Sequence, residues 1–383
     1  MEVMSLVLSW LVLLLSPLEP GGELALQSLT EVRGTELVSE EFRVIEATPT
    51  PGTTFVVLEN DDYFLSRMAG AGGLAWRLPL PAEPSQLLAL GDGLVAVGTS
   101  DGGVVVVNAS GTVLFSGKLP GGGAVRLALV IGEMPEDEES GVNRLVALGA
   151  ETGAVLPLDF SYDGLLFTLP AEPTTLLATI GNTITYGDAW GIVTLDTNGE
   201  ILWRYPLLGS VRVPPAVSGG LVYFAAGDNR LYGLQPDNAA APLVEYLELG
   251  APPTALYALP QSGLAVGTAD GSLLFIQDGE IQSELELIAA PQPGCALRGS
   301  ELIFTVGRDE LIAVELDGTP FAPEEPGFNP PVIGWSYLHP AGFISSPKLF
   351  QPASGVNPTK REQAQLGIYL TGGGGELLVI SRK

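Results

Sequence analysis

A pattern that recurs along most of the chain is the feature that most limits how this sequence can fold. Each copy contains an apolar run, a short turn rich in Gly, Asp or Asn, a second apolar run, another Gly turn, and a third run that ends in an aromatic residue or in Leu-Pro. The six steps from Val56 to Leu302 span 246 residues, a mean period of 41. This period is typical of a four-stranded β-propeller blade. The eight copies begin at Val56, Leu94, Leu145, Ile184, Leu221, Leu264, Leu302 and Ile368.

The apolar runs have the composition of buried strands. VVVV at 104–107 and LLFI at 273–276 are short, β-branched or aromatic, and bounded by turns, as expected for strands that are covered on both faces. A further short run precedes most copies and would supply the innermost strand, as at 87–90, 125–130, 211–217 and 255–259. We therefore expect an all-β fold, a single propeller of about eight four-stranded blades, with seven as the alternative.

The two ends of the chain indicate how such a ring would close. The last copy stops at Lys383 after two strands, which leaves its outer strand missing. Residues 36–47 precede the first full copy and could supply the inner strand of the first blade; with residues 24–32 they could also supply the strand that completes the last blade. Closure by an N-terminal strand would remove exposed sheet edges, which promote aggregation.

The first 22 residues have a different character from the rest. Residues 5–16 (SLVLSWLVLLLS) are mostly apolar, too few to span a bilayer and about right for the apolar region of a signal peptide. No Lys or Arg precedes this run, and no clear small-residue cleavage site follows it. We expect residues 1–22 to direct export to the periplasm or cell envelope and residues 23–383 to form the propeller. The alternatives are an uncleaved anchor, which would be the chain's only membrane contact, and a buried first segment.

Charge and cysteine content exclude several classes of function. The chain has 44 acidic and 17 basic residues, a formal net charge of −27. Binding to nucleic acid depends on basic side chains, so a nucleic-acid partner is not expected. Cys295 is the only cysteine, which rules out an intrachain disulfide and a zinc site with several thiolates. We expect Cys295 to be a small buried core residue.

One copy contains a recognisable motif. In TLDTNGEILWRY, Asp196, Gly199 and Trp203 have the spacing of the tryptophan-docking repeat, and the next copy, at 214–237, is similar in its inner strands. On these residues the chain resembles the quinoprotein-like (PQQ-like) β-propeller family over most of residues 50–383. The resemblance implies that the Gly forms a turn and that the Trp packs on the neighbouring blade. Trp76 keeps the aromatic position in the first copy; Phe115, and later Leu285 or Phe321, would replace it.

The resemblance also allows an enzyme, a quinone-dependent dehydrogenase, but the sequence does not favour it. Such enzymes hold the quinone against a disulfide of adjacent cysteines, which a chain with one cysteine cannot form. His339, the only histidine, has no identified catalytic partners. The Asp and Asn residues that would bind calcium lie in Gly-containing turns, where turn chemistry is the simpler explanation: Asp101, Asp188, Asp228, Asn229, Asp270 and Asp309. We expect no catalytic residue, cofactor or metal.

Two insertions and an aromatic linker point instead to a partner. The insertions, 131–143 and 351–365, fall in equivalent connections of the third and eighth blades, so both should lie on one face of the disc. The first contains the acidic run 133–139, which we interpret as a solvated loop, with a bound cation or basic partner as the alternative. The linker, 327–350, either plugs the ring closure or recognises a protein or peptide. Its candidate partner-binding residues are Trp335, Tyr337, His339, Phe343 and Phe350.

Together these features favour a noncatalytic, exported propeller that acts as a monomeric binding or scaffolding module of the cell envelope, with an unidentified protein or peptide partner. The alternative is a PQQ-dependent or other cofactor-dependent oxidoreductase.

Overall fold

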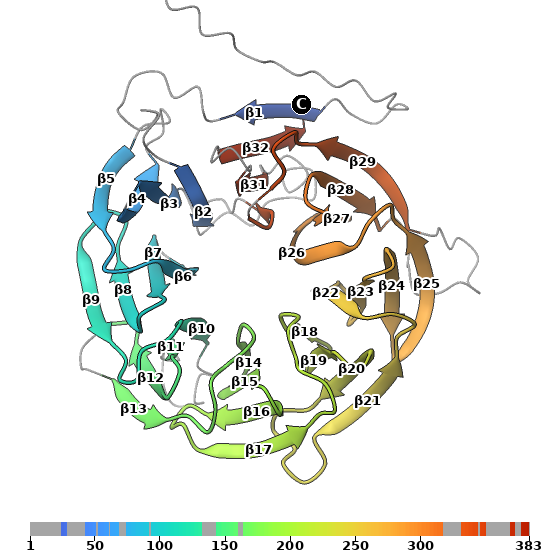
Figure 1. The fold of residues 1–383 in the computed structure, drawn as a ribbon, viewed down its shortest axis with the longest axis horizontal. Coiled ribbons are helices and arrows are strands. Elements are labelled where there is room, and N and C mark those ends of the chain that lie inside the picture. Colours follow the sequence, from blue (N-terminus) through green and yellow to red (C-terminus); the bar gives the residue numbers. More distant parts are fainter. Residues whose placement is uncertain are drawn as a thin grey trace, which may run out of the picture.

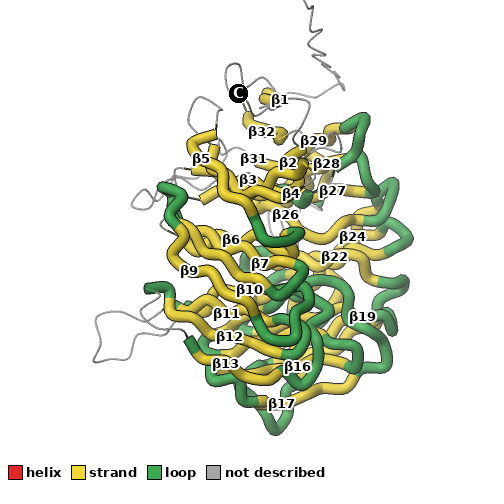
Figure 2. Tube along the Cα trace, turned by 60° about the vertical axis from the view of Figure 1, so that its left-hand side comes forward, coloured by secondary structure: helices red, strands yellow, loops and turns green. Residues whose placement is uncertain are grey.

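The computed structural model describes residues 24–28, 43–50, 53–60, 62–68, 74–91, 93–131, 143–159, 164–316, 331–343, 345–349, 368–371 and 377–382. These residues form strands and turns, with no helix among them (Figures 1 and 2). None of the described segments is therefore a helix that could cross a membrane. The expected leader (1–22), the acidic run 133–139, Phe350 and the insertion 351–365 lie outside the described residues.

The strands form eight four-stranded antiparallel sheets, of which seven are each built from four consecutive strands. We number these seven sheets as blades 1 to 7, from the N-terminal side. Blades 1 to 4 contain β2 (Arg43–Thr50), β3 (Thr53–Asn60), β4 (Asp62–Met68) and β5 (Leu74–Pro79); β6 (Pro84–Gly91), β7 (Leu94–Thr99), β8 (Gly103–Val107) and β9 (Val113–Lys118); β10 (Arg126–Val130), β11 (Arg144–Leu148), β12 (Thr152–Pro157) and β13 (Leu165–Thr168); and β14 (Ala178–Ile180), β15 (Thr183–Gly187), β16 (Gly191–Asp196) and β17 (Ile201–Pro206).

Blades 5 to 7 contain β18 (Ala216–Ser218), β19 (Leu221–Ala226), β20 (Arg230–Leu234) and β21 (Leu243–Glu248); β22 (Pro253–Ala258), β23 (Leu264–Thr268), β24 (Ser272–Gln277) and β25 (Glu280–Glu286); and β26 (Pro291–Arg298), β27 (Glu301–Val306), β28 (Glu310–Glu315) and β29 (Val332–Leu338). In every blade the first strand is innermost and the fourth is outermost (Figure 1).

The remaining sheet, which we call the terminal sheet, combines both ends of the chain. It contains β30 (Lys348–Leu349), β31 (Ile368–Thr371) and β32 (Leu377–Arg382), with β1 (Leu24–Ser28) paired antiparallel to β32. The innermost strands of the eight sheets contact one another in ring order, with β30 between β26 and β2. The expected all-β propeller is confirmed. Seven blades are built from consecutive strands, which is the number given by the alternative expectation. The count reaches eight only when the terminal sheet is included.

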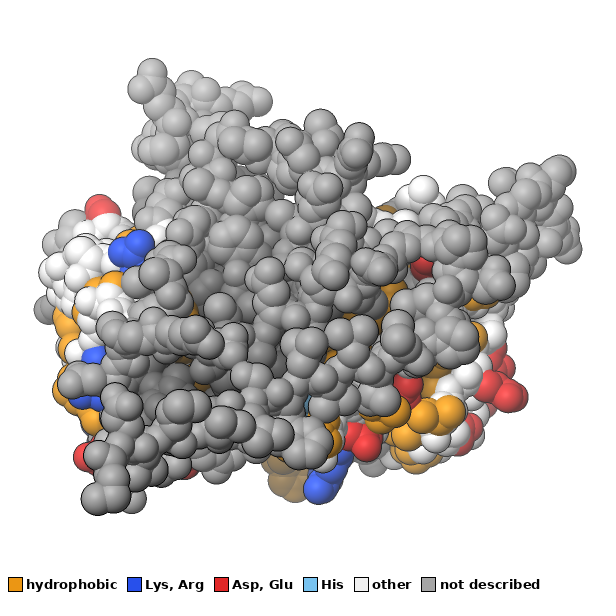
Figure 3. All heavy atoms as spheres, turned by 90° about the horizontal axis from the view of Figure 1, so that it is seen from above, with side chains coloured by type: hydrophobic (Ala, Val, Ile, Leu, Met, Phe, Trp, Pro, Cys, Tyr) orange, Lys and Arg blue, Asp and Glu red, His pale blue; other side chains and the backbone are white. Residues whose placement is uncertain are grey.

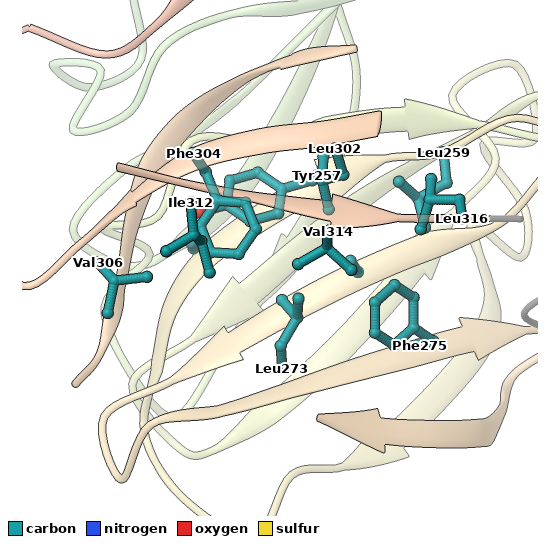
Figure 4. Close-up of a cluster of buried hydrophobic side chains, with 12 residues drawn as sticks. Tyr257, Leu259, Leu273, Phe275, Leu302, Phe304, Val306, Ile312, Val314 and Leu316 are labelled. Carbon is teal, nitrogen blue, oxygen red and sulfur yellow. The ribbon is translucent and has the colours of Figure 1, made fainter. Parts of the chain in front are cut away.

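The core lies between the blades rather than at the centre of the ring. The middle strands β8, β15, β23 and β27 are buried along their whole length because each faces a neighbouring blade on either side. Between blades 6 and 7, for example, Tyr257 and Phe275 of one blade pack with Phe304 and Ile312 of the other (Figure 4). This explains why the strands read as continuous apolar runs rather than as alternating ones.

Side chains near the centre of the ring also tie neighbouring blades together. The Gln86 Nε2 atom of β6 donates to the Leu127 carbonyl of β10 at 3.0 Å, and the Leu127 N–H donates back to Gln86 Oε1 at 2.8 Å. The hydroxyl of Thr179 in β14 donates to the Leu129 carbonyl at 3.0 Å. These bonds satisfy inner-strand groups that no strand of their own sheet can reach, so they set the position of one blade relative to the next.

Two expectations from the sequence need correction. The linker 327–350 is not an irregular segment: its centre forms β29, the outer strand of blade 7. Cys295 is partly rather than fully buried; it lies on the inner strand β26 beside the core of blades 6 and 7. Burial nonetheless raises the pKa of its thiol to about 12, so the thiol remains protonated at neutral pH.

Candidate functional site

The docking motif of blade 4 makes a tight turn between its two outer strands. One carboxylate oxygen of Asp196 accepts hydrogen bonds from the N–H groups of Asn198 and Glu200, each at 2.8 Å. Gly199 has φ of +82°, a backbone conformation that glycine adopts readily. A Cβ atom at Gly199 would overlap the ring of Phe167, which belongs to the outer strand of blade 3. The aromatic ring of one blade thus rests on the glycine turn of the next.

Both tryptophans of the motif make this contact with the following blade. Trp203 is buried, and its indole N–H donates to the Pro236 carbonyl of blade 5 at 2.7 Å. The indole of Trp76 donates to the Ala109 carbonyl of blade 2 at 3.1 Å. A Cβ atom on Gly111 would lie 2.8 Å from the Trp76 ring. These contacts are structural, because they join blades and leave the rings little surface to offer a partner.

Strand register locates the equivalent position in the other blades. The docking residue lies on the outer strand and pairs with a residue of the third strand. In six blades a β-bulge directly follows that paired residue, as it follows Thr194 opposite Trp203 in blade 4. Phe115 occupies the position in blade 2, as expected from the sequence. In blade 6 the residue is Ser283 rather than Leu285, and in blade 7 it is Trp335 rather than Phe321, which lies outside the described residues.

Trp335 is therefore a core residue and not part of an exposed recognition loop. Only 5% of its surface is exposed. Its indole N–H donates to Glu301 Oε1 at 3.1 Å, within its own blade, and the other carboxylate oxygen of Glu301 accepts from Arg298 Nε at 2.8 Å. The following sheet joins β32 to β1, the two ends of the chain, instead of making a turn between consecutive strands. Glu301 of this buried ion pair therefore accepts the indole hydrogen bond of Trp335, whereas Trp76 and Trp203 donate theirs to a backbone carbonyl of the following blade.

The aromatic residues at the end of β29 and just after it pack on one another. The rings of Tyr337, His339 and Phe343 lie 5.4 to 6.3 Å apart, and His339 is buried. The backbone N–H of His339 donates to the Asp309 carbonyl at 2.8 Å. In blades 1 to 6 the corresponding bond is made by Leu80, Leu119, Leu169, Leu207, Leu249 and Leu287. His339 thus takes the place of an anchoring leucine, and Tyr337 and Phe343 are partly buried beside the core that contains Trp335.

The turn aspartates bond to their own turns. Asp101 Oδ1 accepts from the Thr99 hydroxyl at 2.7 Å, and Asp270 Oδ1 accepts from the Thr268 hydroxyl at 2.6 Å. Lys118 and then Thr99 lower the pKa of Asp101 to about 2 by hydrogen bonding. Among the described residues, no group of three or more His, Cys, Asp or Glu side chains is placed to hold a metal ion. Turn chemistry accounts for these aspartates.

A surface that the sequence analysis did not single out lies where blades 4 and 5 meet. Trp190, in the turn between β15 and β16, is 72% exposed, and Leu208, just after β17, is 90% exposed. The Leu207 N–H donates to the Trp190 carbonyl at 3.1 Å, so the two exposed side chains come from bonded segments. The buried carboxylate of Asp188 accepts from the Trp190 N–H at 2.6 Å and also pairs with Arg204. Trp190 is therefore presented on a fixed turn.

Aromatic rings of blades 4 and 5 pack against one another where the two blades meet. The rings of Tyr205 and Tyr232 lie 6.1 Å apart, and those of Tyr232 and Tyr246 lie 5.6 Å apart. The Arg230 guanidinium lies 5.2 Å from the centre of the Tyr246 ring, and the Tyr232 hydroxyl donates to Asp228 at 2.6 Å. Burial and this bond raise the pKa of Tyr232. Trp190, Tyr205, Leu208, Arg230 and Tyr246 together form what we call the Trp190 surface.

The composition of the Trp190 surface suits protein recognition. Tryptophan, tyrosine and arginine are the residues most enriched at the energetic centres of protein interfaces. A sequence signal for it exists: the carbonyl that corresponds to that of Trp190 and accepts the same bond belongs to Tyr63 in blade 1 and to Gly102, Glu151, Asn229, Gly271 and Asp309 in the other blades. Trp190 is thus a large ring at a position that five other blades fill with a small or polar residue. The sequence analysis did not identify this surface, because a single turn residue does not indicate a binding site until its neighbours in space are known.

Comparisons with known proteins agree with this fold. Residues 175–298 match the family model described as outer membrane protein assembly factor BamB. No curated protein sequence matches at a significant level. Among solved structures, BamB from Moraxella catarrhalis is similar with a TM-score of 0.59 and 15% identity, covering 93% of this chain and 98% of that chain. Sqt1 from Saccharomyces cerevisiae is similar with a TM-score of 0.64 and 10% identity, covering 90% and 96%.

A computationally designed protein, Ika8, is similar to the same degree, with a TM-score of 0.63, 15% identity and coverage of 91% of this chain and 98% of that chain. Identities this low show a shared fold and no more. The segment that matches the family model contains Asp196, Gly199 and Trp203, so the resemblance of this chain to the quinoprotein-like (PQQ-like) β-propellers is confirmed.

Proposed function

We propose that this chain is a noncatalytic protein-binding module of the cell envelope and that the Trp190 surface binds its partner. The observation that carries the proposal is the pair formed by Trp190 and Leu208, which are 72% and 90% exposed and belong to segments bonded to each other. Large apolar side chains in such a position lose contact with water when a partner covers them, and this burial stabilises the complex.

Rigidity adds to the suitability of this site. The backbone on either side of Trp190 is held by Asp188, whose oxygen also accepts from the Gly191 N–H at 2.8 Å. A ring that is already fixed loses less conformational entropy on binding than a ring on a free loop. The rings of Tyr205 and Tyr246, which both pack on Tyr232, add contact area beyond the turn.

The comparisons support an envelope location. The matching family model and one similar structure both name BamB, and the model's description places that protein in outer-membrane assembly. A leader at residues 1–22 would deliver this chain to the same compartment. The mass of the mature chain recovered from an envelope fraction tests this part of the proposal, because export with cleavage removes the leader.

The first prediction concerns the partner. Trp190→Ala combined with Leu208→Ser should reduce recovery of the partner in a pull-down from envelope extract at least about tenfold, since interface residues of this kind each contribute about 2 kcal/mol or more. The melting temperature should not change, because both side chains are exposed. A photoreactive residue at position 190 should give one defined protein adduct.

Blade 6 provides a matched control. Ile288 is 85% exposed and follows Leu287 as Leu208 follows Leu207, so Ile288→Ser removes a similar side chain from another part of the disc. This variant should retain the partner. Equal loss in both variants, or an adduct at position 288 and none at 190, would show that the Trp190 surface is not the binding site.

We propose further that β1 closes the ring by completing the terminal sheet as an eighth blade. The antiparallel pairing of residues 24–28 with residues 378–382 supports this role. Backbone hydrogen bonds between the two ends of the chain close the ring without a covalent link, and the strand removes the exposed edge of β32.

A further inference from the structure

The outermost strands of blades 1 to 7 differ in how well they resist pairing with another chain. Each ends its sheet, so each has a row of backbone groups that no strand of its own sheet uses. Five of the seven strands contain at least one charged residue, namely Arg77, Lys118, Arg204, Glu245 with Glu248, and Glu280 with Glu284 and Glu286. The other two strands, β13 and β29, have neither charge nor proline.

β29 is the longer of these two, with seven residues against four. Val332, Ile333 and Leu338 are 50%, 46% and 50% exposed, and Ser336 is also exposed. A long, uncharged edge strand with exposed apolar side chains is a template for another strand. The buried neighbours Trp335 and Ala313 hold this strand in place, so its edge is formed before any partner arrives.

Side-chain direction shows which face a partner would meet. Ile333, Ser336 and Leu338 lie opposite Val314, Ile312 and Glu310 of β28. Ile312 and Val314 belong to the core between blades 6 and 7 (Figure 4). Ile333 and Leu338 therefore lie on the blade 6 side of the strand, opposite the side on which Trp335 packs, whereas Val332 pairs with Glu315 on the Trp335 side.

Charge near β29 indicates what the partner strand would contain. Glu310 lies beside Leu338 and Glu315 lies beside Val332, so one carboxylate stands near each end of the strand. Five residue steps separate the two glutamates, a distance of about 17 Å along a strand. Figure 3, which views the disc edge-on, shows orange apolar and red acidic side chains side by side towards the right of the rim.

We propose that the outer edge of β29, which pairs with no other described strand, binds an extended strand of a partner protein, apolar in its middle and with a Lys or Arg near each end. The partner's backbone groups pair with the edge, its apolar side chains lie beside Ile333 and Leu338, and its cations lie near Glu310 and Glu315. A second copy of this chain fits less well, because each copy has a net charge of −27. This inference rests on the proposed protein-binding function but uses a different surface.

A synthetic probe tests the proposal. The acetylated, amidated hexapeptide lysine-threonine-valine-threonine-valine-lysine, labelled with a fluorophore, should bind the full chain in an anisotropy titration; its lysines are five steps apart, as the two glutamates are. Replacing both lysines by glutamate should weaken binding at least about tenfold, because each like-charge contact replaces an attractive one. N-methylation of alternate peptide bonds should abolish binding, since it removes the backbone donors that a strand must supply.

The chain offers a matched pair of variants. Ser336 and Ser116 each directly follow the docking aromatic residue of an outer strand, and both are exposed or partly exposed. Ser336→Lys places a charge on the β29 edge and should reduce peptide affinity at least about tenfold; Ser116→Lys, on a strand that already contains Lys118, should not change it. Trp190→Ala with Leu208→Ser should also leave peptide binding intact, which separates this proposal from the proposed function.

Three results would overturn the inference. The first is no binding of the lysine peptide at millimolar concentration. The second is equal binding of its N-methylated form, which would indicate apolar contact without strand pairing. The third is a dimer of the chain in analytical ultracentrifugation that Ser336→Lys converts to monomer, which would assign the edge to a second copy.

Discussion

At the scale of single residues, the stability of this propeller depends on rings that cross from one blade to the next. Trp203, which is buried, and Trp76, which is partly buried, each donate an indole hydrogen bond to a carbonyl of the following blade. Phe167 packs on Gly199 with no hydrogen bond to add. The same position thus accepts rings of different polarity: Gly111 lies under Trp76 and Gly199 under Phe167, whereas Trp203 docks on the blade 5 turn at Pro236.

Substitutions at Trp203 separate the ring from its hydrogen bond. Trp203→Ala should lower the free energy of unfolding by about 3–5 kcal/mol, because it leaves a cavity between blades. Trp203→Phe should cost less, since most of the ring remains, although the Pro236 carbonyl loses its donor. Urea unfolding followed by intrinsic fluorescence measures both. The control is Trp190→Ala, expected to change stability by less than about 0.5 kcal/mol; equal effects at the two tryptophans would contradict the docking role.

At the scale of elements, blade 7 shows how an insertion conceals a strand. In blade 4 the turn between the outer strands is short, from Asp196 to Ile201, whereas in blade 7 residues 316–331 separate β28 from β29. A reader of the sequence who expects the usual spacing places the outer strand near Phe321 and takes Trp335 for a linker residue. Pairing with β28 identifies the strand correctly, and pairing is a long-range property.

A second element-scale feature is the clamp between Asp101, in the turn after β7, and Lys118 at the end of β9, with 2.7 Å between Lys118 Nζ and Asp101 Oδ2. The pKa of Asp101 is lowered to about 2, first by Lys118 and then by Thr99. A lowered pKa means that the clamp stabilises the fold above the ordinary aspartate pKa, near 4, and that this contribution is lost as the pH falls towards 2. Lys118→Met should raise the Asp101 pKa towards its ordinary value, measured by carbon-detected NMR titration. An Asp101 that titrates near 2 in this variant as well would assign the shift to the turn alone.

At the scale of the whole molecule, the ring joins segments from both ends of the chain. Lys348 Nζ lies 2.7 Å from Glu46 Oε1, and β1 pairs with β32, so residues about 300 apart in sequence meet at the junction. The blades on either side of the junction are also joined to the rest of the ring, because blade 1 shares an apolar core with blade 2 and blade 7 shares one with blade 6.

Deletion of residues 24–28 tests this junction. We expect the melting temperature to fall by several degrees in a single transition, because loss of β1 exposes the edge of β32 and loosens the terminal sheet. Differential scanning calorimetry measures it, with deletion of residues 2–20 as the control that keeps β1. A synthetic peptide of residues 22–30 should restore the transition when added in excess. An unchanged melting temperature after deletion of β1 would count against closure by this strand.

Much of this protein could be inferred from sequence by itself, because the signals concerned are local. The repeat period follows from the regular spacing of apolar runs and turns, and the Asp196–Gly199 turn follows from chemistry within five residues. The position of Trp335, the leucine-like role of His339 and the Trp190 surface could not be inferred in the same way. Each depends on which strand pairs with which and on which side chains remain uncovered after the blades pack. Those outcomes are decided by contacts between residues distant in the chain, and only the tertiary structure contains them.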